Sequence, residues 1–284
     1  MKAPQIKMID REGRAIACAV WESSQNKPPV FCIHGLTRNG RDFDYFASNL
    51  SDSRPVYAPD VAGRGSSDWL GQHEQYTYDL YVEDALHLLD SMGLDKVDWV
   101  GTSMGGILGQ RIAYEYPERI RKIVINDIGA LITVQMMQRL NDYVGKRMQH
   151  PSEAHGENYI RACYAGFGLT EDWQWQHLLK HSFKAHDDGT HELLYDPHLL
   201  NAILDENLHV TLKENISLWP FWDSIPHPIL LLRGEFSDFL SHEMAQEMVE
   251  RNKNATLLEF KNCGHAPALM NDEQTLAVRA WLDA

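Results

Sequence analysis

Cysteine is scarce in this sequence. The 284 residues include only Cys18, Cys32, Cys163 and Cys263, and no two of them form a C-x-x-C pair. A chain of this length buries about three-quarters of the surface that its unfolded form exposes, so its core does not depend on disulfides. We therefore expect four free thiols in a reducing compartment.

Long apolar runs and an excess of basic residues are also missing. The N-terminal segment MKAPQIKMIDREGRAIACAV lacks the apolar stretch of a secretion signal, and no run of about 18 apolar residues occurs anywhere. Lys and Arg number 26 against 40 Asp and Glu, which gives a net charge of -14. Because this charge repels phosphate groups and anionic lipids, we expect a cytoplasmic protein without a nucleic-acid or membrane partner.

What is present is the composition of a globular protein, with 44% hydrophobic and 23% charged residues. Short apolar segments alternate with segments of helical periodicity. The expected strands are 5–9, 15–21, 30–33, 55–59, 97–102, 120–125, 229–232 and 255–260, and the expected helices are 43–50, 78–92, 107–116, 241–251 and 273–282. This alternation predicts an α/β fold, a mostly parallel sheet with helices on both faces.

The pattern changes between residues 131 and 222. This stretch is rich in aromatic residues and histidine, holds four of the eight tryptophans, and shows no convincing strand. We interpret it as a helical lid inserted before the penultimate strand, with residues 1–130 and 223–284 forming the core. Its histidines His181, His186, His191 and His198 match no zinc-binding spacing, so no metal site is indicated.

Ser103 lies in the sharpest local motif. The segment Gly101-Thr102-Ser103-Met104-Gly105 matches G-x-S-x-G and stands between an apolar strand and a helix. A strand that turns sharply into a helix strains the serine backbone, and larger side chains at the two glycine positions would collide with the turn. The serine hydroxyl then projects beside the N–H groups of the helix start. Ser103 is therefore the candidate nucleophile.

A serine hydroxyl needs a base, and the base needs an orienting group. His265 follows the predicted strand 255–260, and Asp238 follows the predicted strand 229–232. We assign His265 as the base and Asp238 as the acid. Asp127, which follows the predicted strand 120–125, is the alternative acid.

With these residues in the order Ser103, Asp238, His265, the chain resembles lidded esterases of the α/β-hydrolase fold over residues 30–265. The resemblance extends to a His-Gly-Leu-Thr loop at 34–37 and to a glycine turn at 60–68. It implies that the backbone N–H groups of Leu36 and Met104 form an oxyanion hole. It also implies that no cofactor is needed.

Three polar residues near these motifs have simpler interpretations. We expect His34 to hydrogen-bond neighbouring backbone, and Asp60 and Asp68 to brace the glycine turn. The Gly63-x-Gly65 pattern in that turn does not indicate a nucleotide site, since no phosphate-binding loop accompanies it.

The resemblance implies hydrolysis of carboxylic esters with small to medium acyl groups, extending to lactones, through an acyl-enzyme on Ser103. Thioester or carbon–carbon bond hydrolysis is the alternative within the fold. Carbon–carbon hydrolases often carry a tryptophan after the catalytic histidine, whereas Ala266 and Pro267 follow here. A non-enzymatic ligand-binding role is the alternative of another class, and the complete set of three residues argues against it.

Overall fold

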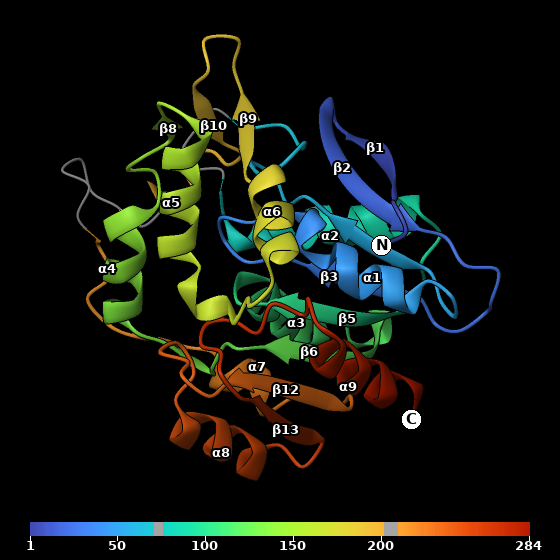
Figure 1. The fold of residues 1–284 in the computed structure, drawn as a ribbon. Helices are drawn as coiled ribbons and strands as arrows, with labels where there is room; N and C mark the ends of the chain where they lie inside the picture. The colour runs from blue at the N-terminus through green and yellow to red at the C-terminus, as the bar shows by residue number, and fades with distance from the viewer. Residues whose placement is uncertain (71–75, 202–209) are drawn as a thin grey trace.

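A central eight-stranded sheet with helices on both faces forms the core of the computed structural model, which describes residues 1–70, 76–201 and 210–284 (Figure 1). The strand order is β1-β2-β4-β3-β5-β6-β12-β13. The strands are β1 Gln5–Arg11, β2 Arg14–Trp21, β3 Val30–Ile33, β4 Val56–Pro59, β5 Val97–Thr102, β6 Ile120–Asn126, β12 Ile229–Gly234 and β13 Ala255–Phe260. The predicted α/β fold is confirmed, with most strand ends displaced by no more than two residues.

The sheet is parallel from β4 to β13, and only β2, in the hairpin with β1 at one side of the sheet, runs in the opposite direction. β1 and β2 pair antiparallel around Glu12 and Gly13, and β2 pairs antiparallel with β4. Every residue of β3, β4 and β12 is buried. This is the burial that continuous apolar runs predict, because a parallel sheet is covered on both faces.

Within the described ranges, five helices cover the two faces. They are α1 Asp44–Leu50, α2 Tyr78–Ser91, α3 Met104–Glu115, α8 His242–Arg251 and α9 Asp272–Asp283. Buried side chains of α1 and α9 pack on one face, and those of α2, α3 and α8 pack on the other. Parallel strands covered in this way bring all their carboxyl ends to one edge, where ligands bind in such folds.

The segment between β6 and β12 contains short strands as well as helices. Its helices are α4 Val134–Tyr143, α5 Glu153–Cys163, α6 Asp172–Lys180 and α7 Trp219–Trp222, and its strands are β7 Leu131–Ile132, β8 Gln149–His150, β9 Phe183–Ala185, β10 His191–Leu193 and β11 Ile216–Ser217. Most of these elements lie together on one side of the core (Figure 1). The prediction that this region has no strand is wrong. Strands of two or three residues are too short to show an alternating pattern. Part of the predicted lid, residues 202–209, lies outside the described residues.

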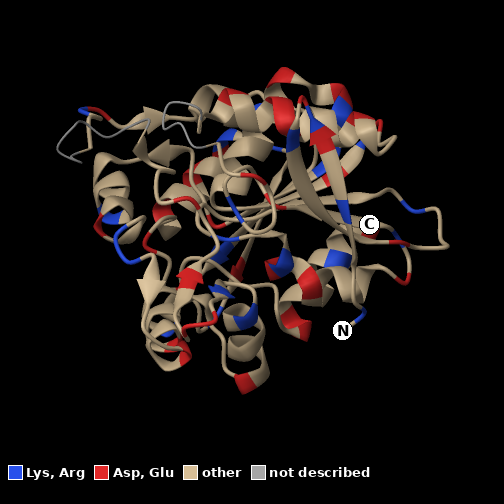
Figure 2. Cartoon of the chain, turned by 90° about the horizontal axis from the view of Figure 1, so that it is seen from above, with Lys and Arg blue, Asp and Glu red and all other residues tan. Residues whose placement is uncertain are grey.

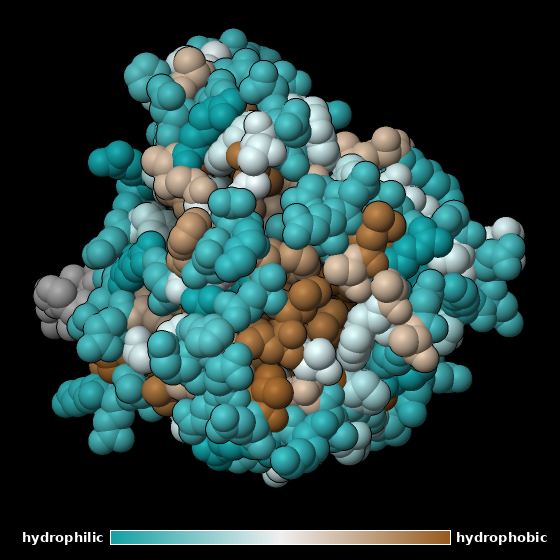
Figure 3. Space-filling view, turned by 60° about the horizontal axis from the view of Figure 1, so that its bottom comes forward, coloured by the Kyte–Doolittle hydropathy of each residue, from teal (hydrophilic) through white to brown (hydrophobic). Residues whose placement is uncertain are grey.

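The surface is mixed in character. Acidic and basic residues are interspersed on the outer helices (Figure 2). On one face, apolar atoms gather near the centre within hydrophilic surroundings (Figure 3). Within the described ranges, no helix combines the length and the hydropathy that crossing a bilayer requires.

Candidate active site

Ser103 occupies the tight turn between β5 and α3. Its φ of 51° and ψ of -112° form a backbone conformation that residues with a side chain rarely adopt, at a cost of about 1 to 3 kcal/mol. A Cβ atom at Gly101 would lie 2.1 Å from the backbone oxygen of Gly105, and one at Gly105 would lie 2.1 Å from that of Ile33. Both glycines are therefore required by backbone packing, as the motif predicts. Helix α3 begins at Met104, three residues before the predicted start, because the chain enters the helix directly from the turn.

His265 lies in the loop after β13 and faces the serine. Its Nε2 is 3.0 Å from Ser103 Oγ, and its Nδ1 is 2.9 Å from Asp127 Oδ2. The ring of Phe239 stacks on the imidazole with centroids 4.0 Å apart, which restricts its rotation. The structure thus brings the predicted nucleophile and the predicted base within hydrogen-bond distance.

The carboxylate beside His265 belongs to Asp127, at the end of β6. Its side chain is completely buried. Oδ1 accepts a hydrogen bond from the backbone N–H of Gly234 at 3.0 Å, and Oδ2 accepts one from the Ser237 hydroxyl at 2.6 Å. These two hydrogen bonds fix the direction of the carboxylate toward the imidazole. Ser237 was not predicted as a site residue, and only its place in the loop after β12 could have suggested it.

The assignment of Asp238 as the acid is corrected by this geometry. Asp238 forms an ion pair with Arg139 of α4, and both side chains are substantially exposed. The loop after β12 does reach the site, but it presents the hydroxyl of Ser237 to Asp127, while the Asp238 side chain pairs with Arg139 and not with His265. The alternative acid, Asp127, holds the position that we had given to Asp238.

The 34–37 loop lies beside the serine. A Cβ atom at Gly35 would lie 3.8 Å from the Cβ of Ser103. In the described part of the chain, the N–H groups of Leu36 and Met104 donate no hydrogen bond to another protein atom. Both N–H groups are therefore available to donate to a substrate oxygen, which the predicted oxyanion hole requires.

His34 anchors this loop from below. Its Nδ1 lies 2.7 Å from the carbonyl oxygen of Gly35, and its Nε2 accepts a hydrogen bond from the Val61 N–H at 3.0 Å. Burial lowers the pKa of His34 to about 3, so the ring is neutral at physiological pH. This is the backbone-bracing role that we expected.

Asp60 and Asp68 brace the glycine turn, as predicted. Asp60 accepts hydrogen bonds from the N–H groups of Gly40 and Ser66, and Asp68 accepts one from Ala15.

Ser103 opens onto an apolar cavity of about 510 Å³. One face of α3 forms a wall, since Met104, Ile107, Arg111 and Glu115 are spaced three or four residues apart. Other walls come from Met136 and Leu140 of α4, from Phe221 of α7, and from Leu200. Of the four tryptophans between 131 and 222, none lines the described part of this cavity.

A smaller chamber of about 120 Å³ also contains Ser103 and His265. Its lining is more polar. Thr37 and Tyr164 share a hydrogen bond of 2.9 Å, and Arg139 reaches the same chamber. The nucleophile therefore lies between a strongly apolar space and a smaller one of mixed lining.

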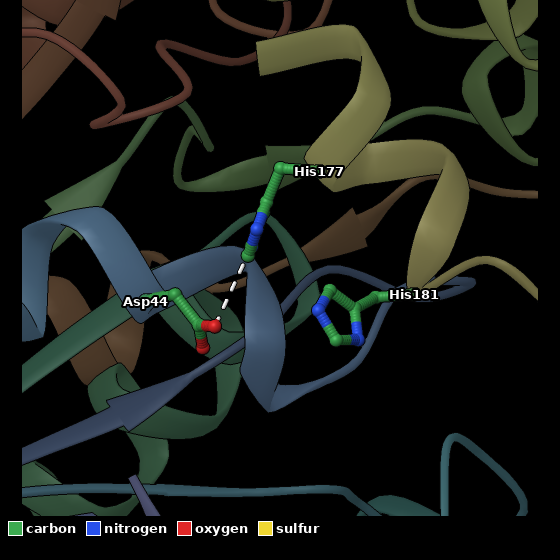
Figure 4. Close-up of side chains that lie close together, drawn as sticks. All are labelled: Asp44, His177 and His181. Carbon is green, nitrogen blue, oxygen red and sulfur yellow. Dashed lines mark ion pairs between the residues drawn. The ribbon is translucent and has the colours of Figure 1, made fainter. Parts of the chain in front are cut away.

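One group of side chains in the described ranges has the composition of a metal site. Asp44, His177 and His181 place one ligand atom each within 4.8 Å of one another, with both histidines on α6 or its end (Figure 4). Arg41, however, donates to both oxygens of Asp44, and His177 Nε2 lies 2.9 Å from the Arg41 carbonyl oxygen. Because a guanidinium already neutralises the carboxylate, the cluster fits a contact between α6 and α1 better than a cation site.

His186 and His198 pair instead with Glu192 and Asp196. In the described part of the chain, the four histidines that we considered do not gather into one cluster.

A strand-turn-helix serine, a histidine from the last strand loop and a buried carboxylate define the site of an α/β-fold hydrolase. The comparisons agree. Residues 30–278 match the alpha/beta hydrolase family, and the chain belongs to that family.

Several relatives match most of the chain. A 3-hydroxybutyrate-oligomer hydrolase from Cupriavidus necator is 34% identical over 257 residues, which cover 89% of this chain and 88% of the relative. An esterase from Mycobacterium tuberculosis is 25% identical over 255 residues, which cover 87% of this chain and 78% of the relative.

Solved structures show the same likeness. An alpha/beta hydrolase from Novosphingobium aromaticivorans superposes with a TM-score of 0.88 at 28% identity, covering 100% of this chain and 99% of the other. A crystal structure from Rickettsia typhi has a TM-score of 0.90 at 30% identity, covering 98% of this chain and 99% of the other.

Proposed function

We propose that the protein hydrolyses carboxylic esters of small to medium acyl groups through an acyl-enzyme on Ser103. The observation that carries the proposal is the unbroken hydrogen-bonded series from Ser103 Oγ through His265 to Asp127. An imidazole so placed can take the hydroxyl proton as the oxygen attacks a carbonyl carbon.

The remaining groups have roles in the same reaction. As the carbonyl oxygen gains negative charge, the N–H groups of Leu36 and Met104 hydrogen-bond to it, and each such donor contributes about 3 to 4 kcal/mol in the transition state. Asp127 stabilises the imidazolium that forms. His265 then gives its proton to the departing alcohol, and a water molecule activated by the same imidazole cleaves the acyl-enzyme.

The two chambers divide the substrate between them. The apolar cavity next to Ser103 suits a hydrocarbon acyl group, because burying apolar surface contributes about 25 cal/mol per Å². The smaller chamber, with Thr37, Tyr164 and Arg139, suits a polar leaving group. The relative that acts on 3-hydroxybutyrate oligomers makes short oligomers of hydroxy acids a sensible part of the substrate panel.

The proposal is tested by labelling with a fluorophosphonate, which reacts with activated serines. The wild-type protein should be labelled on Ser103, as peptide mapping would show, and Ser103→Ala should not be labelled. A panel of esters of increasing acyl length, with lactones, thioesters and 3-hydroxybutyrate oligomers, then defines the preference. Folded wild-type protein that is neither labelled nor active on any ester would contradict the proposal and favour a ligand-binding role.

A further inference from the structure

Arg64, in the glycine turn, is a fully buried cation without an acidic partner. Its side chain has no exposed surface, and among the described residues its hydrogen-bond partners are neutral groups, none of them a carboxylate. Its neighbours are neutral, since Nη1 donates to the Ala62 carbonyl oxygen at 2.6 Å and to the Tyr81 hydroxyl at 2.7 Å. The guanidinium carbon also lies over the ring of Tyr81, 4.9 Å from its centroid. A buried charge is normally paired, so its retention here calls for a counter-charge.

The other two nitrogens of Arg64 reach the two residues whose N–H groups form the oxyanion hole. Nε donates to the carbonyl oxygen of Leu36 at 2.8 Å, and Nη2 lies 3.3 Å from Met104 Sδ. Leu36 belongs to the loop after β3, whereas Met104 begins α3. One planar guanidinium therefore connects two segments that must stand at a fixed separation for both N–H groups to meet the same oxygen.

The turn that carries Arg64 is itself fixed by the segment between β6 and β12. Gly65 donates its N–H to the carbonyl oxygen of Leu194, and Asp196 donates to that of Gly63, both at 2.8 Å. These hydrogen bonds fix the backbone on both sides of Arg64. The position of the Arg64 Cα atom is therefore set, as are the contacts of its guanidinium.

We propose that Arg64 is the positioning residue of the oxyanion hole. Its unpaired positive charge also stabilises the negative charge that develops on the substrate oxygen. The inference rests on the proposed function, because it takes Leu36 and Met104 as the oxyanion donors. Arg64 holds the spacing of the two donors in the resting protein and adds a positive potential beneath them. It touches neither the substrate nor the reacting atoms.

The test compares Arg64→Met and Arg64→Lys with wild type in ester turnover, with rates expressed per active site counted by fluorophosphonate labelling. Losing one oxyanion donor outright costs other hydrolases about 100- to 1000-fold in kcat, so we expect about a 10- to 100-fold loss of kcat in Arg64→Met from misplaced donors. KM should change by less than about 3-fold, because ground-state binding uses other contacts. Arg64→Lys keeps the charge but not the planar fork, and should retain an intermediate kcat.

A second readout separates positioning from simple bracing. The affinity for a trifluoromethyl ketone, which forms a tetrahedral oxyanion on the serine, should fall in proportion to kcat/KM across the two variants. Arg54→Met is the matched control. Arg54 is also a buried arginine, but it precedes β4, at the amino end of that strand, and pairs with Asp98. Its loss should lower the melting temperature and leave kcat per active site unchanged.

If one of the two Arg64 variants fails to fold, the other still tests the inference. If a folded Arg64→Met or Arg64→Lys keeps wild-type kcat and wild-type affinity for the ketone, the inference is overturned. That result differs from failure of the proposed function, in which wild-type Ser103 itself would not be labelled.

Discussion

Replacing Asp127 by asparagine should nearly abolish ester turnover, because the change removes the negative charge beside His265. Asparagine has almost the same shape, so packing is retained. The carboxylate lies 2.9 Å from Nδ1 and is completely buried. For unit charges about 4 Å apart and an effective dielectric constant of about 20, the lost interaction with the imidazolium is about 4 kcal/mol.

This energy corresponds to about a 1000-fold loss, at 1.36 kcal/mol for each factor of ten. The same substitution in a serine protease costs about 10,000-fold, since the amide also favours the wrong imidazole tautomer. We therefore expect kcat to fall by about 1000- to 10,000-fold. Initial rates of ester hydrolysis measure it, and thermal unfolding shows whether the variant is folded.

Asp238→Asn is the matched control for the same assay. Its exposed ion pair with Arg139 contributes at most about 1 kcal/mol, so turnover should change by less than about 5-fold. If Asp238→Asn loses activity by 1000-fold while Asp127→Asn keeps it, the reasoning from the geometry is refuted.

Three further predictions concern stability and specificity. Burial lowers the pKa of His34 from 6.5 to about 3, so between these pH values the unfolded chain binds a proton that the folded chain does not. His34→Gln should therefore reduce the slope of unfolding free energy against pH, measured by urea titration, by about 1.4 kcal/mol per pH unit. An unchanged slope would count against a neutral buried ring. Gly105→Ala should destabilise the protein by more than about 3 kcal/mol in the same titration, because its Cβ atom would lie 2.1 Å from a backbone oxygen. Its control is Gly93→Ala, which has a φ of 67° and open space around it and should cost only about 1 to 2 kcal/mol. Equal losses of stability would argue against the tight turn. Ile107 lines the apolar cavity about 6 Å along α3 from Ser103, by the helical rise. Ile107→Trp should lower kcat/KM for long acyl chains at least 10-fold more than for acetyl esters. An equal loss for both would show that the acyl group does not lie along this wall.

Most of the core could be predicted from the sequence, because its signals are local. β3, β5 and β13 begin and end at the predicted residues. The run of β3 is entirely apolar, since helices cover both faces of the parallel sheet at its centre. The G-x-S-x-G motif likewise encodes the turn at Ser103. A Cβ atom at Gly101 would collide with the backbone of Gly105 four positions away, whereas one at Gly105 would collide with the backbone of Ile33 in β3.

The choice of acid could not be made in the same way. Asp127 and Asp238 both follow a strand of the parallel sheet, and sequence order favours neither on physical grounds. What decides is the path of two loops: Asp127 adopts a φ of 61°, and Ser237 points its hydroxyl at that carboxylate. These are contacts between residues 110 positions apart, which no local pattern reports.

The central claim is that His265 activates Ser103 to form a covalent acyl-enzyme. Its most direct measurement is the intact mass of the protein, quenched in acid within the first turnover of a p-nitrophenyl ester. The account predicts a gain equal to one acyl group in the wild type, mapped to Ser103, and no gain in Ser103→Ala or His265→Ala. Rapid ester turnover with an acyl group on another residue, or an equal gain in Ser103→Ala, would contradict it.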